Sequence, residues 1–558
     1  MPVRLPYSLD RIVTPLSWEA WQANLVHHPD RAFANWLVAG IRGGFRIGYD
    51  YTLGRPKSSQ RNLASALEKP QVIREYLAKE CAEGRIMGPF AMTELSQLHI
   101  SRFGVVPKST PGKWRLILDL SSPKGHSVND GISEACCSLS YVSVEDAVEA
   151  VMKKGRGASL AKVDIRNAYR VLPVHPDDRW LLGMRWEGAL YVDTTLPFGL
   201  RSAPKIFTGV ADAVEWSAKR EGVDSVLHYL DNYLVVGRPE SDECAYFLST
   251  LTSLCDRLGL PIALEKLEGP ACVLTFLGIE IDTLNMQLRL PHAKLLELRA
   301  LIRSWLGRKA CSRRELQSLT GKLQHACKVV KPGRSFLRRM FELLRGIGKA
   351  HHQVRLNHSF RSDLVWWDAF LESWNGVSFL QPAECGTPDQ HLFTDAAGSF
   401  GCGGLWNGHW FQYRWSDAFR MERIPQQELL PIVIACMLWG RQWHGQHIRC
   451  HCDNVAVVQV VNSGYSTDKQ MMRLIRCLFF VTAHWQLLVR AVHIAGDKNT
   501  AADAVSRGNM DIFFQVVPDA CQSPTTIPSA VLGLLVEQQP DWLSPAWAQL
   551  FRSYLQQA

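Results

Sequence analysis

The chain has 558 residues, which is too long for one hydrophobic core of at most about 250–300 residues, so we expect several domains. Hydrophobic residues make up 47% and charged residues 21%, a balance that is typical of globular proteins and excludes a disordered chain. The net charge is +9, and residues 301–350 alone carry 13 Lys/Arg against 2 Asp/Glu. A segment in which nearly all charged residues are positive indicates a surface that binds a polyanion. A helix face that is only solvated normally carries both positive and negative residues.

No apolar run approaches the roughly 18 residues that a membrane span needs, and no signal peptide is evident. The 15 cysteines contain no C-x-x-C pair, so we expect reduced thiols, an intracellular location (cytoplasm or nucleus) and no membrane partner. A cluster of possible zinc ligands comprises His444, His447, Cys450, His451 and Cys452. Residues 447–452 are strand-like, so Cys450 and Cys452 share one face while His451 points away, which disfavours zinc.

The first 89 residues contain helical segments and no chemical motif. From residue 100, RFGVVP and KWRLILDLS are strand-like and flank a loop rich in turn residues, which predicts a hairpin. Lys108, Lys113 and Arg115 lie at or beside its tip. Such cations suit a triphosphate, which Arg can hold through two parallel hydrogen bonds, although an ordinary basic hairpin tip has the same composition.

Three motifs follow within residues 159–237. LAKVDIRNAYR predicts a strand ending at Asp164, LPFGLRSAPKIF is loop-like around Gly199, and HYLDNYLVVG predicts a hairpin with Asp231-Asn232 as its two-residue turn. Asp164 and Asp231 could meet across a sheet and hold two Mg²⁺ ions, typically about 3.5–4 Å apart, for in-line phosphoryl transfer. The alternative is that Asp164 caps a helix and Asp231-Asn232 is only a turn.

In this order the three motifs resemble the palm of a reverse transcriptase: VDIRNAYR its first aspartate motif, LPFGLRSAP its template-and-nucleotide motif, and YLDN its tyrosine-x-Asp-Asp hairpin. Asn232 departs from the family, which has a second aspartate there. The resemblance implies that Asp164 and Asp231 bind metal beside Asn232. It also implies that Lys108 and Arg115 contact the nucleotide's phosphates, that Tyr169 acts as a steric gate against a ribose 2′-hydroxyl, and that Lys266 protonates pyrophosphate.

Residues 301–350 have helical spacing, and as a thumb they would follow duplex phosphates through Arg338, Arg339 and Arg345. The tryptophans of DLVWWDAFLESWNG could stack on bases, but packing between domains is the interpretation we favour. Asp193 in YVDTTLPFGL is expected in a loop.

Beyond residue 386 we predict a three-strand meander, an amphipathic helix opening at PQQELL, a strand HIRCHCD, a helix KQMMRLIRCLFFVTAHW, a strand LLVRAVHIA and a helix NTAADAVSR. This order resembles ribonuclease H, with Asp395 on the first strand, Glu428 in the first turn of the first helix, Asp453 at a strand end and Asp503 on the last helix. The resemblance implies that these four acids hold two metals that activate water to cut a phosphodiester. His493 is the nearest candidate for the family's mobile histidine.

We therefore expect an α+β multidomain protein: a right-hand polymerase (fingers, palm, thumb) followed by an RNase H-like α/β domain with a mixed five-stranded sheet. The expected domains are a mostly helical region (1–89), fingers and palm (90–285), a basic helical thumb and connection (286–385), the RNase H-like domain (386–510) and a helical tail (511–558).

The runs WRLILDLSSPKGHSVNDGI, KPGRSFLRR, DLVWWDAF and ADAVSR are most similar to tyrosine-recombinase retrotransposons of the DIRS type. This resemblance implies an RNA-directed DNA polymerase with ribonuclease H (endonuclease) activity and two Mg²⁺ or Mn²⁺ ions per site. Implied partners are an RNA template, a DNA primer, RNA–DNA hybrid, dNTPs and a recombinase on another chain or downstream. The alternative is a retroelement-derived nucleic-acid-binding protein or nuclease that no longer polymerises, and Asn232 is the residue that separates the two.

Overall fold

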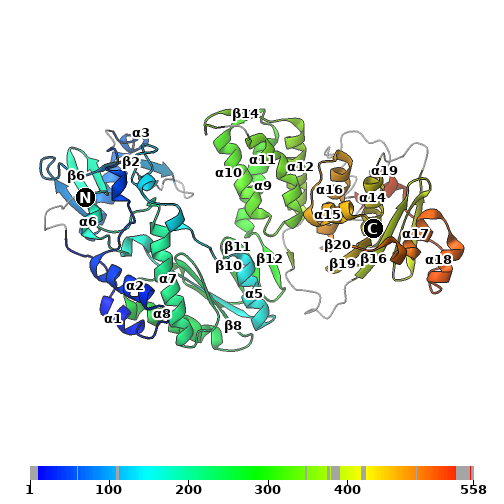
Figure 1. Cartoon of the computed structure of the whole chain (residues 1–558), viewed down its shortest axis with the longest axis horizontal. Coiled ribbons are helices and arrows are strands. Elements are labelled where there is room, and N and C mark those ends of the chain that lie inside the picture. Colours follow the sequence, from blue (N-terminus) through cyan, green and yellow to red (C-terminus); the bar gives the residue numbers. More distant parts are fainter. Residues whose placement is uncertain are drawn as a thin grey trace. The chain divides into compact units, whose positions relative to one another are not determined.

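The computed structural model describes residues 10–58, 61–107, 112, 114–345, 348–373, 377–378, 390–415, 423–485, 487–535 and 553–554. It divides into two compact units, unit 1 (Met1–Leu277) and unit 2 (Gly278–Ala558) (Figure 1). The division falls a few residues before the palm–thumb boundary expected from the sequence.

Unit 1 contains the elements expected of fingers and palm. Its helices are α1 (Trp18–Asn24), α2 (Arg31–Gly43), α3 (Ala64–Leu67), α4 (Pro70–Ala82), α5 (Val144–Lys154), α6 (Pro176–Arg179), α7 (Ala203–Arg220) and α8 (Glu243–Leu258), with short 3₁₀ turns at η2 (Tyr51–Leu53), η3 (Asn129–Gly131), η4 (Ala135–Cys137), η5 (Ala168–Val171) and η6 (Leu264–Lys266). Its strands are β1 (Ile86–Phe90), β2 (Ile100–Pro107), β3 (Trp114–Asp119), β4 (Ser159–Asp164), β5 (Gly183–Trp186), β6 (Ala189–Asp193), β7 (Val226–Tyr229), β8 (Asn232–Gly237), β9 (Glu268–Ala271) and β10 (Val273–Phe276).

The fingers form a five-stranded sheet in the order β1-β6-β5-β2-β3. The predicted hairpin is confirmed, because β2 and β3 pair antiparallel with Pro107 opposite Trp114. Lys108 and Lys113, at its tip, lie outside the described residues, whereas Arg115 is exposed on β3 opposite Val106.

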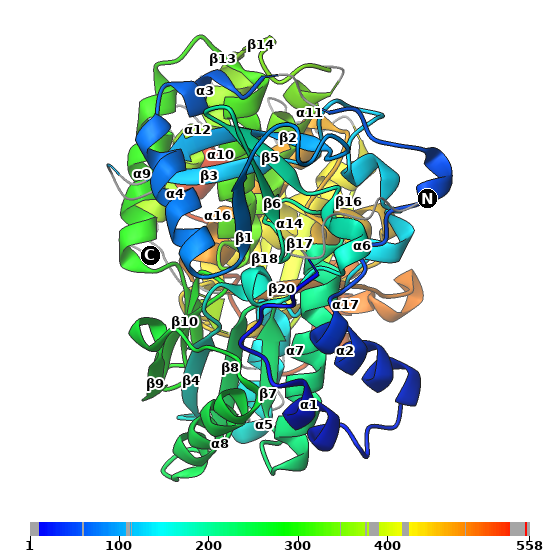
Figure 2. The same ribbon diagram turned by 90° about the vertical axis from the view of Figure 1, so that its left-hand side faces the viewer.

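The palm forms a four-stranded sheet in the order β7-β8-β4-β9, backed by α5, α7 and α8 (Figure 2). The predicted hairpin exists, but its turn is shifted by one residue. Tyr229 pairs with Asn232, so Leu230 and Asp231 form the two-residue turn and Asn232 begins β8. Leu230 adopts φ 53°, a conformation that apolar residues rarely accept. The sequence therefore indicated Asp231-Asn232 as the turn, because these residue types are the ones common in two-residue turns.

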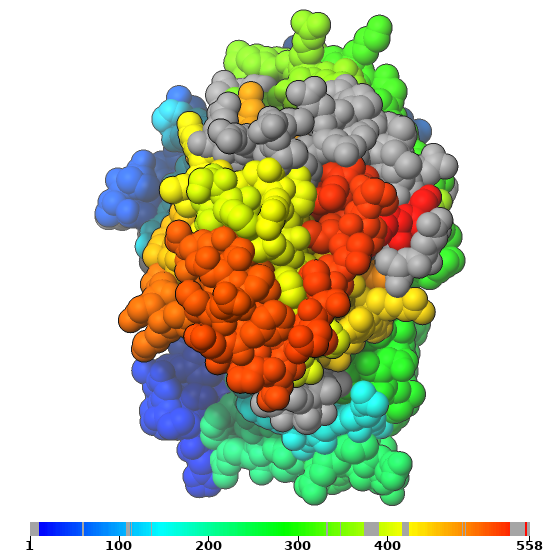
Figure 3. All heavy atoms as spheres, turned by 90° about the vertical axis from the view of Figure 1, so that its right-hand side faces the viewer, coloured from blue at the N-terminus to red at the C-terminus, as the bar shows by residue number. Residues whose placement is uncertain are grey.

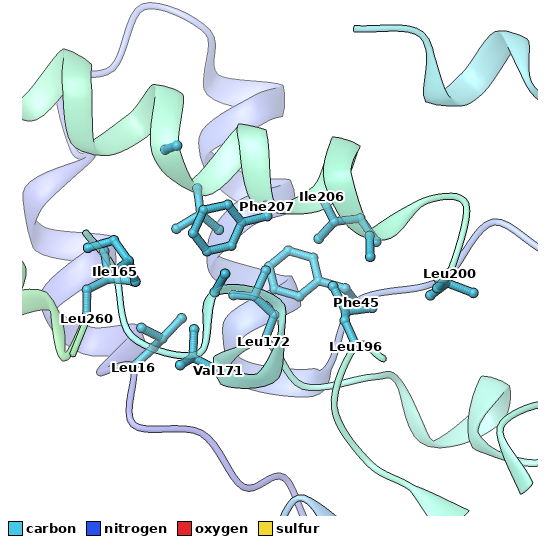
Figure 4. Close-up of a cluster of buried hydrophobic side chains, with 14 of the residues drawn as sticks. Leu16, Phe45, Ile165, Val171, Leu172, Leu196, Leu200, Ile206, Phe207 and Leu260 are labelled. Carbon is cyan, nitrogen blue, oxygen red and sulfur yellow. The ribbon is translucent and has the colours of Figure 1, made fainter. Parts of the chain in front are cut away.

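The described residues of the N-terminal region, 10–58 and 61–89, contact both the fingers sheet and the palm. Strand β1 is the edge of the fingers sheet, and α1 packs on the palm, where the buried Trp21 donates its Nε1–H to the carbonyl oxygen of Leu258 at 3.0 Å. Figure 4 shows Leu16 and Phe45 from this region beside Phe207 of α7 and Ile165, the residue after Asp164. The N-terminal region therefore supports the end of β4, where the first candidate site begins.

Asp193 was expected in a loop, and this prediction is wrong. It is the last residue of β6, fully buried, and its carboxylate lies 2.6 Å from Nη1 of Arg170. Arg170 also binds Glu80 of α4 at 2.9 Å. Burial raises the pKa of Asp193 to about 6, while the positive charge of Arg170 lowers it. A buried carboxylate is stable only when it is paired with a cation, which Arg170 supplies. The resulting network joins β6, η5 and α4.

Unit 2 contains the helical thumb, the RNase H-like domain and part of the tail. Its helices are α9 (His292–Leu306), α10 (Arg313–Ala326), α11 (Arg338–Leu344), α12 (His358–Ser373), α14 (Ile424–Trp439), α15 (Val455–Ser463), α16 (Lys469–His484), α17 (Thr500–Arg507), α18 (Met510–Val516) and α19 (Ser529–Leu535), with 3₁₀ turns at η7 (Lys331–Phe336) and η8 (Gly496–Lys498). Its strands are β11 (Ile279–Asp282), β12 (Gln287–Arg289), β13 (Ala310–Ser312), β14 (Gln353–Arg355), β15 (Val377–Ser378), β16 (Gln390–Ala397), β17 (Gly401–Trp406), β18 (His409–Arg414), β19 (His447–Cys452) and β20 (Leu488–His493).

The tryptophans of α12 and Arg339 make structural contacts in the thumb. Trp366 and Trp367 of α12 are buried, and Trp366 stacks on Phe336 with ring centroids 3.7 Å apart, so the packing interpretation of these two tryptophans is confirmed. Arg339, expected on a nucleic-acid surface, binds the fully buried Asp363 at 3.2 Å, beside Arg476 at 3.1 Å. Arg339 is thus committed to a structural ion pair, because removing it would leave a buried carboxylate short of a cation.

The RNase H-like sheet has the order β18-β17-β16-β19-β20, with β16, β17 and β18 antiparallel and β16, β19 and β20 parallel. The predicted meander and mixed five-stranded sheet are therefore confirmed. The first helix, α14, was expected to be amphipathic, but every residue from Gln426 to Met437 is buried, so this prediction is wrong. Helix α15 was not predicted. Figure 3 shows one face of the molecule, on which α17 and α18 appear in orange. Among the described residues no helix has both the length and the apolarity to cross a membrane.

Candidate active sites

The first candidate site lies where β4 ends beside the β7–β8 turn. Asp164 and Asn232 are direct partners in the β4–β8 ladder. The backbone N–H of Ile165 donates to the carbonyl oxygen of Asp231 at 2.8 Å, which fixes the turn against the end of β4. The structure thus brings together Asp164, Asp231 and Asn232, which the sequence predicts as one site.

Lys266 joins the same cluster from η6. The N–H of Ala263 donates to the carbonyl oxygen of Asp164 at 2.8 Å, and this contact anchors η6 beside β4. The Nζ of Lys266 then lies 2.8 Å from Oδ1 of Asp164, although the lysine side chain remains more than half exposed. The hydrogen bond to Asp164 raises the pKa of the Lys266 ammonium, while partial burial opposes it.

The carboxylates of this site are crowded. Asp164 is only 6% exposed. Burial raises the pKa of Asp231, and the negative charge of Asp164 raises it further. The Nδ2 of Asn232 donates to Oδ1 of Asp231 at 3.3 Å. Two close, desolvated carboxylates with oxygen donors form the ligand type that Mg²⁺ and Mn²⁺ prefer, so the residues fit the predicted ions.

Tyr169 lies on η5, which begins after Asn167 in a left-handed conformation (φ 60°). Its ring makes edge contacts with Phe198 and Phe207, with centroids 5.4 and 5.7 Å apart. Burial raises the pKa of Tyr169 to about 12, and the charge of Asp231 adds to this effect. Phe198, the exposed aromatic of LPFG, was not singled out from the sequence, although a 57% exposed phenylalanine beside the expected gate is a second apolar ring at the site.

The second candidate site is built on the parallel pair β16 and β19. Phe393 is opposite His451, so Asp395 and Asp453, each two residues later, come at the same level beyond this pair. Glu428 approaches from α14, where it is the fifth residue and therefore lies beyond the first turn expected for it. Asp503 comes from α17, where Arg507 binds its carboxylate at 2.7 Å.

Burial and neighbouring carboxylates raise the pKa values of two of these acids, Glu428 and Asp395. Burial raises the pKa of Glu428 to about 9, with further contributions from the charges of Asp395 and Asp453. Burial also raises the pKa of Asp395, while the hydroxyl of Ser506, which donates to its Oδ2, opposes the shift. The Oε2 atom of Glu428 is buried and has no hydrogen-bond partner in the part of the chain that the structure describes. A converging acidic set with an unsatisfied oxygen fits the expected dications, since a bound ion would supply the missing partner.

Ser506 and Cys452 were not predicted as part of this site. Ser506 lies one turn after Asp503 in ADAVSR, a spacing that places both on one helix face. Cys452 is fully buried at the end of β19, with its Sγ among the carboxylates of Glu428 and Asp453. His493, the expected mobile histidine, ends β20, and its Nε2 lies 3.1 Å from the carbonyl oxygen of Asp453.

The strand alternation that disfavours a local zinc cluster is observed. Cys450 and Cys452 are buried on one face of β19, whereas the ring of His451 stacks on Phe393 from the other face, with centroids 4.4 Å apart.

Residues 106–281 match the family model described as reverse transcriptase (RNA-dependent DNA polymerase). The chain is 24% identical over 277 residues to the Pro-Pol polyprotein of feline foamy virus, which is 50% of this chain and 21% of that protein. It is 27% identical over 176 residues to the Pro-Pol polyprotein of simian foamy virus type 1, covering 32% and 14%. The chain thus contains a reverse transcriptase domain with foamy-virus relatives. It spans only about a fifth of the length of the feline foamy virus protein.

A comparison with solved structures matches foamy viral protease-reverse transcriptase in complex with double-stranded DNA, at 15% identity and a TM-score of 0.45, covering 89% of this chain and 99% of that one. Another is the foamy viral protease-reverse transcriptase bound to an RNA/DNA hybrid, at 14% identity and a TM-score of 0.46, covering 88% and 64%.

Proposed function

We propose that the protein is an RNA-directed DNA polymerase with ribonuclease H activity. The observation that carries the proposal is the pairing of Asp164 with Asn232 beside Asp231, inside the segment that matches the reverse transcriptase family. A second cluster of Asp395, Glu428, Asp453 and Asp503 on an RNase H-like sheet supports the nuclease activity. The proposed partners are an RNA template, a DNA primer, RNA–DNA hybrid and dNTPs.

At the polymerase site Asp164 and Asp231 would hold the divalent ions, Mg²⁺ or Mn²⁺, with the amide oxygen of Asn232 beside them. Bound there, the ions supply Lewis acidity that makes the primer 3′-hydroxyl a nucleophile and steadies the leaving pyrophosphate. Lys266, exposed and hydrogen-bonded to Asp164, can release its proton toward the pyrophosphate as that leaves. Tyr169, held by Phe198 and Phe207, presents a rigid ring against the sugar.

The fingers and thumb would supply the phosphate contacts. Arg115 is exposed on β3 beside the hairpin tip, where it can bind a triphosphate through two hydrogen bonds. Arg345 is exposed after α11, and Arg338 lies 3.6 Å from the ring centroid of Tyr465 while binding Glu342 at 2.9 Å. Of the three thumb arginines, Arg345 is therefore the one that we assign to duplex phosphates.

At the nuclease site Asp395, Glu428, Asp453 and Asp503 would hold the ions that activate water and stabilise the leaving oxygen. Ser506 orients the carboxylate of Asp395 through its hydroxyl, and Arg507 orients that of Asp503. Such supporting contacts fix ligand geometry in metal sites.

We further propose that the chain comes from a retrotransposon of the DIRS type, on the motifs WRLILDLSSPKGHSVNDGI, KPGRSFLRR and ADAVSR, and that a recombinase acts with it from another chain or from a downstream segment. The competing function is a retroelement-derived nucleic-acid-binding protein or nuclease without polymerase activity. The observation that favours it is Asn232, which removes one negative charge from the hairpin.

Primer extension on an RNA template, with Mg²⁺ and with Mn²⁺, tests the polymerase directly. We expect extension that is stronger with Mn²⁺ and that disappears in Asp164→Asn. Cleavage of the RNA strand of a hybrid, compared with Asp395→Asn, tests the nuclease in the same preparation. Cleavage without extension would favour the competing function, and the absence of both would refute the proposal.

A further inference from the structure

A thiol lies inside the second acidic cluster. Cys452 ends β19 and is fully buried, and its Sγ lies within 4.8 Å of one carboxylate oxygen of Glu428 and one of Asp453, which are also within 4.8 Å of each other. The backbone N–H of Asn454 donates to this sulfur at 3.5 Å. The thiol therefore faces the same space as the carboxylates that we assign to the nuclease ions.

A second observation, an unpaired buried oxygen, points to a cation at this place. Glu428 is only 4% exposed, and its buried Oε2 atom has no hydrogen-bond partner among the described residues. Leaving a buried acceptor unpaired is unfavourable, and more so when the group is charged. A cation bound between Glu428 and its neighbours would supply the partner.

The donor set differs from one made of carboxylates alone. Carboxylate oxygens suit Mg²⁺, whereas a thiolate selects Zn²⁺ and similar soft ions. Ligand atoms around a tetrahedral Zn²⁺ lie about 3.3–3.8 Å apart, given Zn–S near 2.3 Å and Zn–O near 2.0–2.2 Å. Sulfur and oxygen atoms already within 4.8 Å of one another need only a small inward movement to reach this spacing.

We propose that Glu428, Cys452 and Asp453 form a site for a thiophilic divalent ion, Zn²⁺ or Cd²⁺, and that this ion inhibits the nuclease. On binding, the S–H bond of Cys452 breaks, its proton passes to water, and the sulfur lone pair forms the bond to the metal, without oxidation or reduction. Glu428 and Asp453 are then withdrawn from the Mg²⁺ ions. Metal binding needs only the three donors, while inhibition rests on the proposed nuclease function.

This site shares Cys452, but no other residue, with the local histidine and cysteine cluster. Its ligands come from α14, the end of β19 and the residue after it, whereas His451 faces the opposite side of the sheet. Cys450, two residues earlier on the same buried face, offers a matched control, because it is equally buried but is not within the donor group.

Cadmium titration of the full chain tests the binding, with the thiolate-to-cadmium charge-transfer absorbance as the readout. We expect the wild type and Cys450→Ser to show the same high-affinity phase, and Cys452→Ser to lose it. Glu428→Gln keeps the thiol and should weaken that phase at least tenfold, which protects the test if Cys452→Ser folds poorly. An unchanged phase in both Cys452→Ser and Glu428→Gln would overturn the proposal.

Zinc inhibition tests the consequence. We compare the Zn²⁺ concentration that halves each protein's own Mg²⁺-dependent cleavage of an RNA–DNA hybrid. It should rise at least tenfold in Cys452→Ser and stay unchanged in Cys450→Ser. Equal sensitivity in all three proteins would overturn the inhibitory role. If the wild type does not cleave hybrid at all, the proposed nuclease function fails, while the cadmium result still decides whether the metal site exists.

Discussion

The ammonium of Lys266 lies 2.8 Å from the carboxylate of Asp164, although the two residues come from different elements, η6 and the end of β4. The contact places a proton donor next to the residue that we assign to the polymerase metals. It also supplies one positive charge to a crowded pair of carboxylates. Lys266 is therefore positioned both to neutralise the site and to donate a proton during catalysis.

The first prediction concerns this lysine. Lys266→Gln should lower the nucleotide-incorporation rate about 100-fold, within the range of general acid catalysis, with a smaller change in the KM for dNTP. Lys162→Gln is a matched control, because Lys162 lies on the same palm sheet and binds Glu268 at 2.7 Å. Single-turnover primer extension measures both parameters. A loss confined to KM would make Lys266 a phosphate-binding residue instead of an acid.

The second prediction concerns the nuclease. Asp395→Asn and Glu428→Gln should each lower hybrid cleavage by roughly 100-fold or more, because even losing a residue that only supports a metal ligand costs about 10–100-fold. Affinity for hybrid should change little, since neither buried acid contacts phosphate by itself. Asp511→Asn, an exposed change on α18, is the control. Cleavage that survives both substitutions would show that the acidic cluster is misassigned.

The third prediction separates two thumb arginines. Arg345→Gln should lower the log–log salt slope of duplex binding by about one unit and leave stability unchanged, because Arg345 is exposed. Arg339→Gln should instead destabilise unit 2 by about 3 kcal/mol, since it leaves the buried Asp363 with only Arg476. Filter binding across salt concentrations and urea unfolding measure the two effects. An exchange of these outcomes would reverse the two assignments.

The motifs of the sequence predicted the two acidic sites because strand periodicity and turn residues are local properties. The exact β7–β8 turn was not predictable, because Leu230 adopts a positive φ that apolar residues rarely accept. Long-range pairings were missed for a related reason. Arg170 with Asp193, and Arg339 with Asp363, join elements whose proximity no local pattern indicates. The same holds for Cys452, whose neighbour Glu428 lies on another element.

The fourth prediction concerns acid stability. His99 is buried near the hydroxyls of Ser58 and Ser101, and burial lowers its pKa from 6.5 to about 4. Between these values the unfolded chain binds a proton that the folded chain does not, so stability falls as the pH decreases from 6.5 to 4. The full loss is about 3 kcal/mol. Urea unfolding at several pH values should show this slope in the wild type and in His126→Gln, an exposed control. His99→Gln should flatten the slope, and a slope that persists there would assign it to other groups.

The last prediction concerns Asn232. Its amide begins β8 opposite Asp164 and donates to Asp231, so the hairpin forms without a second aspartate. An amide keeps an acceptor oxygen but removes one negative charge beside two dications, so metal binding should be weakened, not lost. We expect slow polymerisation that is more active with Mn²⁺, which is less demanding of coordination geometry than Mg²⁺.

Asn232→Asp should raise the extension rate at least tenfold, which corresponds to about 1.4 kcal/mol of transition-state stabilisation. Asn167→Asp, on the turn before Tyr169, changes the same charge outside the ladder and serves as the control. Primer extension on an RNA template at a fixed, subsaturating Mg²⁺ concentration measures the difference. If the wild type extends as fast as Asn232→Asp, the weakened-metal account of the site is wrong. If neither extends while hybrid cleavage persists, the charge lost at Asn232 is not the cause of the missing polymerase activity. The chain is then a nuclease that no longer polymerises.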